Sequence, residues 1–107
     1  MKYICPICGY KDLDEPAYDK YGDGSYDICS CCKFQFGYDD DVEVEEGVFM
    51  EIPETHIIYR LNWIKEGAPV FNTEYYPKKF QLNGKVKKEY LIEQLKNINI
   101  DFYNINK

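Results

Sequence analysis

Apolar residues recur at helical spacing in the segment PETHIIYRLNWIKEGAP, near the middle of the chain. Ile57, Leu61 and Ile64 follow one another at intervals of four and three positions, so they share one face of an α-helix. Ile58 widens this apolar stripe. The spacing therefore predicts a helix across this segment, with these four side chains along one face.

Both ends of this segment carry residues that favour a helix boundary. Pro53 or Thr55 can begin the helix, since proline is tolerated in a first turn and threonine is a common N-cap. Gly67 is suited to the C-terminal cap, and Pro69 cannot continue a helix. We therefore expect the helix to end just before Gly67.

A second helix is predicted from about Val86 to Asn97. Leu91, Leu95 and Ile98 lie on one face of it, at intervals of four and three positions. Residues 70–84 show neither helical nor strand periodicity, and we expect them to be irregular. Alternating apolar residues in the tail, NINIDFYNINK, indicate a short terminal strand.

The N-terminal region carries no helical pattern and is rich in turn-forming residues. Short β segments are expected at KYI and SYDI, with a turn at KYGDGS between them. The acidic stretch GYDDDVEVEEG is expected to be a loop that ends in a short strand, because Val42 and Val44 alternate with glutamates. The chain thus divides into a turn-rich region, residues 1–40, and a helical region, residues 53–107.

Five cysteines lie within the first 32 residues of the chain. Cys5 and Cys8 form one pair with two residues between them, and Cys29 and Cys32 form a second pair after 20 intervening residues. Two such pairs, separated by about 15 to 20 residues, are typical of a tetrahedral zinc site. Two residues between cysteines allow one tight turn to bring both sulfurs within about 2.3 Å of a single ion. We therefore predict a metal site formed by these four cysteines.

Residues around each pair agree with this interpretation. Pro6 stiffens the first turn, and Gly9 can adopt the positive φ that such turns often require after the second cysteine. Lys33 occupies the equivalent position in the second turn, where a left-handed lysine costs about 1 kcal/mol. Cys31 is the surplus thiol, because neighbouring cysteines cannot easily bind one ion together in such a turn. We expect Cys31 to be a small unliganded side chain, with a register-swapping ligand and a redox sensor as alternatives.

Three other uses of paired cysteines remain open. The sequence CPICGY and the later Cys-x2-Cys pair are similar to rubredoxin, in which four thiolates bind iron for electron transfer, although the gap is shorter here. A thioredoxin-like dithiol needs cysteines at the start of a helix in a β-α-β unit, which residues 1–32 do not indicate. A catalytic zinc usually has an open position and a histidine or carboxylate ligand. His56, the single histidine, lies at a predicted helix start, so we expect it to cap or pack. Structural zinc is our lead interpretation, and iron is the alternative.

Charge is distributed unevenly along the 107-residue chain, whose formal net charge is −6. Residues 1–54 contain 14 acidic residues and 4 lysines, whereas residues 55–107 contain 5 acidic and 9 basic residues. A metal bound by four thiolates adds about −2 to the acidic half. Such a field repels phosphate backbones, and we therefore do not expect nucleic-acid binding.

The remaining features indicate a cytoplasmic protein without a membrane segment. The start, MKYICPICGY, has no apolar run of signal-peptide length, and no segment reaches the roughly 18 apolar residues that span a bilayer. Paired thiols in such a chain fit a reducing cytosol. The sequence shows no phosphate-binding glycine loop and no Ser-His-Asp set, so we expect a non-enzymatic protein.

The chain resembles a family of small bacterial cysteine-rich proteins at four places: CPICGYKDLDEPAYD, YDICSCCKFQFGYDDD, THIIYRLNWIKEGAPVF and IEQLKNI. The related cysteine-rich CPCC domain proteins are similar to its front half. The resemblance covers nearly the whole chain and implies a zinc-ribbon-like metal module with an attached helical segment. It also implies an immunity or toxin-neutralising role, which a location near toxin genes has suggested for related proteins. The chain departs from the family at Ser30, where proline is usual, and at Lys33, where glycine is common.

These observations together predict a small α+β protein with a single domain, residues 1–107. A zinc-ribbon-like metal module with four cysteine ligands, residues 1–40, is expected to pack against the helical segment, residues 53–107. The predicted function is the binding of another protein, of basic character, through an acidic surface. That surface consists of the acidic loop Asp39–Glu46 and the aromatic side chains that precede it. Its expected members are Phe34, Phe36, Tyr38, Asp39, Asp40 and Asp41.

Overall fold

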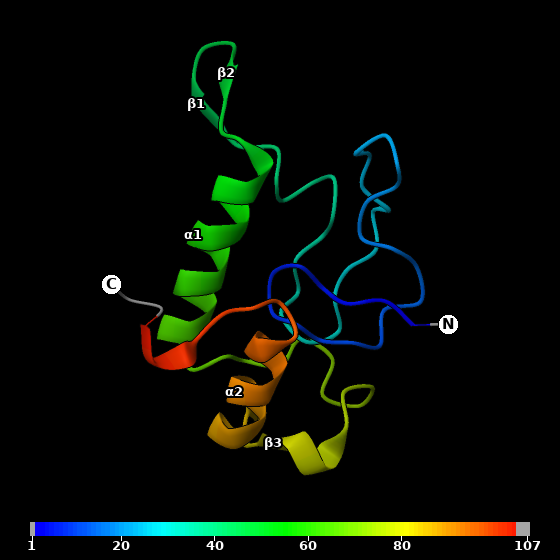
Figure 1. Cartoon of the computed structure of the whole chain (residues 1–107), viewed down its shortest axis with the longest axis vertical. Helices are drawn as coiled ribbons and strands as arrows, with labels where there is room; N and C mark the ends of the chain where they lie inside the picture. The colour runs from blue at the N-terminus through cyan, green and yellow to red at the C-terminus, as the bar shows by residue number, and fades with distance from the viewer. Residues whose placement is uncertain (1, 105–107) are drawn as a thin grey trace.

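The computed structural model describes residues 2–104 of the chain, in which two helices form most of the regular structure. Helix α1 spans Ile52–Lys65 and helix α2 spans Lys88–Lys96 (Figure 1). Both predicted helices are thus confirmed. Helix α1 has Pro53 in its first turn, and Gly67, just beyond its end, has a φ of 94°. The boundaries of α1 therefore follow the proline and glycine signals of the sequence.

Helix α1 buries a different face from the one that its aliphatic residues predict. Thr55, Arg60 and Trp63 are buried, whereas Ile57 and Ile58 are 49% and 47% exposed. The buried face lies against the cysteine loops, whose backbone carbonyls need hydrogen-bond donors. Arginine, tyrosine and tryptophan provide such donors and isoleucine does not. The helix therefore turns polar and aromatic side chains inward and leaves two isoleucines at the surface.

The first of two small antiparallel sheets is a hairpin in the acidic stretch. Strand β1, Glu43–Glu45, pairs with strand β2, Val48–Phe49, so that Glu43 lies opposite Phe49. This agrees with the strand that the alternating valines and glutamates predict. Every residue from 41 to 49 is exposed, and the hairpin extends away from the body of the molecule beyond the start of α1 (Figure 1).

The second sheet lies in a segment that the sequence pattern predicts to be irregular. After a 3-10 turn at Lys78–Phe80, strand β3, Gln81–Leu82, pairs with strand β4, Lys85–Val86. Asn83 and Gly84 connect the two strands with φ angles of 55° and 77°. Two consecutive positive φ angles define the tight hairpin turn in which Asn-Gly is the favoured pair. The prediction that residues 70–84 are irregular is therefore wrong at this hairpin. The Asn-Gly pair is the sequence signal that identifies the hairpin.

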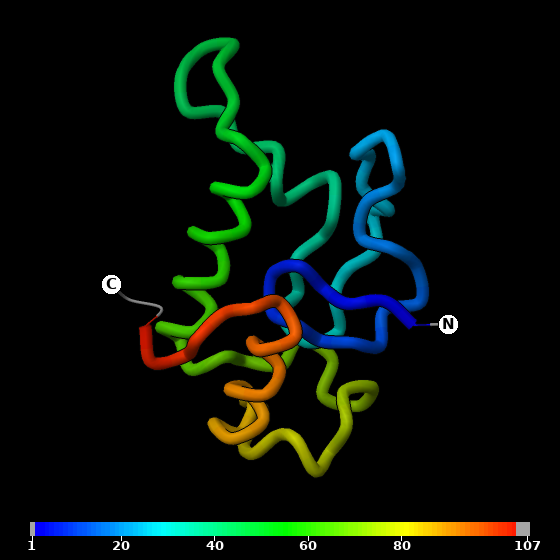
Figure 2. Tube along the Cα trace, viewed as in Figure 1, coloured from blue at the N-terminus to red at the C-terminus, as the bar shows by residue number. Residues whose placement is uncertain are grey.

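The N-terminal region contains isolated bridges rather than strands. Three antiparallel bridges connect its loops: Tyr3 with Leu13, Tyr18 with Gly24, and Ile28 with Gln35. The β segments expected at KYI and SYDI are thus reduced to single bridges, and Figure 2 shows the region as open loops, blue to cyan. Within the described part of the tail, a 3-10 turn at Phe102–Asn104 takes the place of the expected strand, and residues 105–107 lie outside that part.

The core lies where the cysteine loops meet both helices. One buried cluster contains all five cysteines together with Phe34, Phe36, Trp63, Leu91 and Leu95, and therefore joins the two regions of the chain. The result is a small α+β fold with two helices, two small antiparallel sheets and one core. Among residues 2–104, no helix combines the length and the apolar character that crossing a membrane requires.

We expect the two faces of the helices to respond differently to truncation. Leu95→Ala removes a side chain that is 0% exposed and should lower the free energy of unfolding by about 2–5 kcal/mol. Ile57→Ala removes one that is 49% exposed and should lower it by about 0.5 kcal/mol or less. Urea denaturation of both variants, purified with metal, measures the difference. An equal decrease in the free energy of unfolding for the two variants would show that Ile57 is packed as tightly as Leu95.

Candidate metal centre

Four cysteine sulfurs converge at the centre of the core. The Sγ atoms of Cys5, Cys8, Cys29 and Cys32 all lie within 4.8 Å of one another. The Cys5 and Cys32 sulfurs are 3.8 Å apart, and the Cys8 and Cys29 sulfurs are 3.7 Å apart. A tetrahedral ion with metal–sulfur bonds of about 2.3 Å separates its ligands by about 3.8 Å. The donor set therefore fits one tetrahedral metal ion.

The same distances exclude disulfide bonds among these residues. A disulfide places its sulfurs about 2.05 Å apart, and all five cysteines of this chain are free. Each of the four converging cysteines is at most 2% exposed. The cluster can thus bind a metal ion out of contact with bulk water.

The two cysteine turns have the same backbone structure. In the first turn the Gly9 N–H donates to the Cys5 carbonyl at 2.9 Å, and in the second the Lys33 N–H donates to the Cys29 carbonyl at 3.0 Å. Gly9 and Lys33 have φ angles of 82° and 73°. The positive φ expected after the second cysteine of each pair is therefore present in both turns. The repeated geometry explains how two separate segments present their sulfurs in the same way.

The residue after each pair differs because its surroundings differ. A Cβ atom on Gly9 would lie 1.8 Å from the backbone oxygen of Gln94 in α2, so only glycine fits there. Lys33 is exposed, and its ammonium group lies 5.6 Å from the centre of the Phe71 ring. The second turn therefore accommodates a side chain, at the cost of about 1 kcal/mol for a left-handed lysine.

The backbone carbonyls of the first turn accept hydrogen bonds from helix side chains. Arg60 of α1 donates from Nε to the Ile7 carbonyl at 2.6 Å and from Nη2 to the Pro6 carbonyl at 2.9 Å. In α2, Gln94 donates from Nε2 to the Cys8 carbonyl at 3.0 Å. Four consecutive carbonyls are satisfied in this way, since Asn97 donates from Nδ2 to the Gly9 carbonyl, also at 3.0 Å.

The second turn obtains equivalent hydrogen bonds from other donors. The backbone N–H groups of Asn72 and Phe71 donate to the carbonyls of Ser30 and Cys31, at 2.9 and 3.0 Å. The Tyr59 hydroxyl of α1 donates to the Cys32 carbonyl at 2.8 Å. The side chains that donate to the carbonyls of the two turns were not identified from the sequence. The one sequence signal for them is Arg60, the single arginine of the chain, which lies among apolar residues of α1.

Burial governs the protonation of the thiols. It raises the pKa of Cys5, Cys8 and Cys32, whereas hydrogen bonds from the neighbouring thiols lower the pKa of Cys29. A metal ion that binds all four sulfurs must therefore displace protons from the cluster. Burial lowers the pKa of Arg60, and the negative charge of Cys5, Cys8 and Cys32 opposes this shift. Arg60 is thus a buried cation close to three of the clustered cysteines.

Cys31 lies outside the four-sulfur cluster. It is 0% exposed, and its sulfur accepts a hydrogen bond from Nε2 of Gln94 at 3.3 Å. The Oε1 atom of Gln94 accepts a hydrogen bond from the Tyr76 hydroxyl at 2.8 Å. Gln94 therefore connects the surplus thiol, the first cysteine turn and a buried tyrosine.

The structure separates the predicted docking residues into buried and accessible groups. Three of them lie in the interior: Phe34, Phe36 and Asp40, with exposed fractions of 0%, 0% and 5%. Tyr38 is 67% exposed, Asp41 is exposed and Asp39 is half-buried. The surface expected from the sequence is corrected accordingly, because Phe34 and Phe36 fill the core beside the cysteine cluster.

Asp40 takes part in an internal hydrogen-bond network. Its carboxylate accepts hydrogen bonds from the Gly37 N–H, at 3.0 Å, and from the Tyr18 hydroxyl. The Tyr18 hydroxyl also lies 2.8 Å from Nε2 of His56, whose ring packs edge-on against Phe34. Burial raises the pKa of Tyr18 and lowers that of His56, so both are neutral at pH 7. His56 is therefore a half-buried packing residue, which is one of the two roles expected of it.

Three curated proteins of Bacillus subtilis (strain 168) are similar to this chain over most of its length. The uncharacterized protein YoaQ is 38% identical over 95% of this chain and 91% of its own length. The uncharacterized proteins YozI and YhgB are 36% and 32% identical over 95% and 94% of this chain, and over 89% and 96% of their own lengths. No family model matches the chain. No solved structure matches it either.

We expect serine substitution to separate the four clustered cysteines from Cys31. Cys5→Ser, Cys8→Ser, Cys29→Ser and Cys32→Ser should each abolish stoichiometric metal and the cooperative thermal transition of the cysteine loops, because a structural metal contributes roughly 10–16 kcal/mol in small modules. Cys31→Ser should retain the metal and change the free energy of unfolding by about 1 kcal/mol or less. Elemental analysis and thermal melts measure both effects. Loss of metal in Cys31→Ser with retention in Cys32→Ser would reassign the ligand of the second turn.

Proposed function

The chain belongs to the family of the Bacillus subtilis proteins YoaQ, YozI and YhgB, and we propose that it is a zinc-stabilised, non-enzymatic protein that binds a basic protein partner. The observation that carries this proposal is the closed set of four cysteine sulfurs, which accompanies an exposed acidic hairpin. Unpaired thiols persist in reducing compartments, so the proposed location is the cytoplasm.

Zinc is the ion that we assign to this donor set. Four thiolates in tetrahedral geometry are typical of structural zinc, whereas a catalytic zinc keeps an open position. Each of the four cysteines is at most 2% exposed, and side chains of both helices cover the first turn, so a substrate has no access to the ion. The metal would therefore act on the fold, as in a zinc-ribbon-like module, and not on a reaction. Iron bound by the same sulfurs, as in an electron carrier, is the competing assignment.

The β1–β2 hairpin and the residues that flank it form the proposed docking surface. Between Phe34 and Tyr59 the chain contains eight acidic residues, of which Asp40 is buried, and no lysine or arginine. Val44, Val48 and Phe49 of this hairpin are 52%, 49% and 53% exposed, which gives the acidic surface an apolar component. Such a surface favours a cationic partner by charge complementarity, which raises the association rate, while the apolar side chains supply contact area. A basic toxin is one partner of this chemistry.

Metal analysis distinguishes the two assignments of the ion. Protein purified from cells grown with both metals should be colourless and contain one equivalent of zinc, because zinc has a filled d shell and no visible absorbance. Added iron should give a red form only after the zinc has been removed. Red protein as isolated, with absorbance that dithionite bleaches, would replace structural zinc with electron transfer by iron.

The docking surface is tested by matched charge variants of the holo-protein. We expect Glu43→Gln/Glu45→Gln in β1 to lose basic partners in pull-downs from the native host at low salt, and wild-type binding to weaken from 50 to 300 mM salt on the order of tenfold. Glu89→Gln/Glu93→Gln in α2 makes the same change in net charge away from the hairpin and should retain the partners. Mass spectrometry identifies and quantifies the captured proteins. Equal capture by both double variants would rule out the hairpin as the docking surface.

A further inference from the structure

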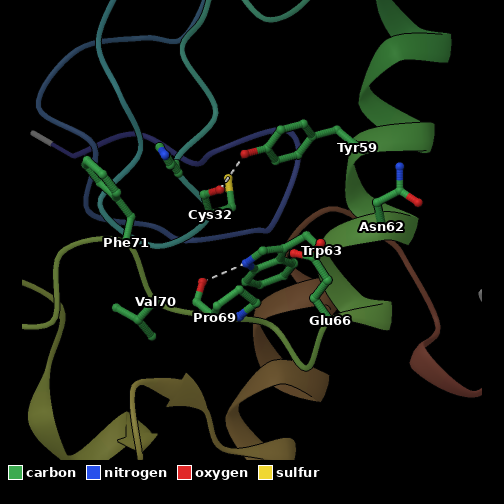
Figure 3. A pocket seen from close by; sticks show the side chains of 9 residues that line it. Cys32, Tyr59, Asn62, Trp63, Glu66, Pro69, Val70 and Phe71 are labelled. Carbon is green, nitrogen blue, oxygen red and sulfur yellow. Dashed lines mark hydrogen bonds between the residues drawn. The ribbon is translucent and has the colours of Figure 1, made fainter.

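A cavity of about 460 Å³ opens beside the second cysteine turn. Figure 3 shows Tyr59, Asn62 and Trp63 of α1, and Glu66 directly after it, on one side of the cavity, and Phe71 on the other side. Its remaining lining residues are Cys32, Lys33, Pro69 and Val70. A volume of this size lies within the range of small-molecule sites, roughly 300–1,000 Å³. The metal-binding turn thus forms one wall of a cavity large enough for a small molecule.

The aromatic walls of this cavity are fixed by their own polar atoms. Trp63 donates from Nε1 to the Pro69 carbonyl at 2.9 Å, and Tyr59 donates from its hydroxyl to the Cys32 carbonyl at 2.8 Å (Figure 3). Both rings are therefore held before any ligand arrives. Trp63 is 4% exposed and forms the base of the cavity, whereas Tyr59 is half-buried and Phe71 is 47% exposed, so these two rings offer apolar surface to a ligand.

Three polar side chains of the lining have no such partner. Lys33, Asn62 and Glu66 form no ion pair and no side-chain hydrogen bond in the part of the chain that the structure describes. The Lys33 ammonium lies over the Phe71 ring, at 5.6 Å from its centre. The cavity therefore combines a cation, a carboxylate and an amide, all free, with a wall of aromatic rings.

Two residues at or beside the cavity have a left-handed backbone, one set by the cysteine turn and the other by the end of α1. Lys33 has a φ of 73° at the position where the equivalent turn has Gly9, so glycine would relieve this strain. Ala68, which precedes Pro69 in the opposite wall, has a φ of 56°. A lysine at position 33 gains nothing for the turn itself, but it places a cation at the cavity.

We propose that this cavity binds a small zwitterion with an aromatic side chain, either a free aromatic amino acid or a short peptide with free termini. The ligand carboxylate pairs with Lys33, and its ammonium group pairs with Glu66. The aromatic side chain packs against the rings of Tyr59 and Phe71. Asn62 can donate to the carboxylate or accept from the ammonium group. This inference does not depend on the acidic hairpin or on the identity of the metal.

Trp63 is the single tryptophan of the chain and therefore reports binding directly. The metal-loaded protein is titrated with L-phenylalanine, and the fluorescence emission of Trp63 is recorded. The excitation wavelength is one that phenylalanine does not absorb. We expect a saturable change in emission. Phenylalanine amide, which lacks the carboxylate, and N-acetylphenylalanine, which lacks the ammonium group, should each bind at least about tenfold more weakly. Tighter binding of phenylalanylphenylalanine than of the amino acid would identify a peptide as the ligand, and the reverse would identify the amino acid.

Two variants and their matched controls complete the test. Lys33→Gly and Glu66→Gln should each raise the dissociation constant at least about tenfold, whereas Lys65→Gln and Glu54→Gln, on α1 but outside the lining of the cavity, should leave it unchanged. Lys33→Gly should also keep the metal and raise the melting temperature, because it relieves a left-handed lysine. That combination of higher stability and weaker binding is not expected of a purely structural lysine. The proposal is overturned by the absence of a saturable response to every probe, or by equal dissociation constants in Lys33→Gly, Glu66→Gln and wild type.

Discussion

Four buried thiols can share one ion only if the backbone that carries them turns tightly twice, and each turn leaves peptide carbonyls without internal partners. In this protein the first turn faces the interior, where water cannot satisfy those carbonyls. Arg60, Gln94 and Asn97 supply the missing donors from two different helices. Both helices therefore lie where their side chains can donate hydrogen bonds to the carbonyls of the first cysteine turn. The polar buried face of α1 has the same cause.

Features that depend on neighbouring residues could be predicted from the sequence. The cysteine spacing identifies the four sulfurs that the structure brings together, because two residues between cysteines define a tight turn wherever the turn occurs. The positive φ angles of Gly9 and Lys33 follow from that same local geometry. The hairpin at Asn83 and Gly84 was predictable in the same way, since its signal is a dipeptide.

Features that depend on distant residues could not be predicted in this way. Arg60 is 53 residues from the Ile7 carbonyl that it binds, and no local pattern announces that contact. An acidic run usually indicates a solvated loop, yet Asp40 is buried because Tyr18 approaches it from another loop. The apolar stripe of α1 predicts the wrong buried face for a related reason. Hydrophobic periodicity does not show which face of a helix must donate hydrogen bonds to the backbone carbonyls of a neighbouring loop.

The sequence separation of the capping side chains has a consequence for the order of events during synthesis. The side chains that bind the carbonyls of Pro6, Cys8 and Gly9 follow them in the chain by 54, 86 and 88 residues. Because a polypeptide emerges from the ribosome N-terminus first, both pairs of cysteines reach the solvent well before the two helices that enclose them. The nascent chain thus passes through a stage in which its thiols are accessible to metal, before Arg60, Gln94 and Asn97 can cover the first cysteine turn.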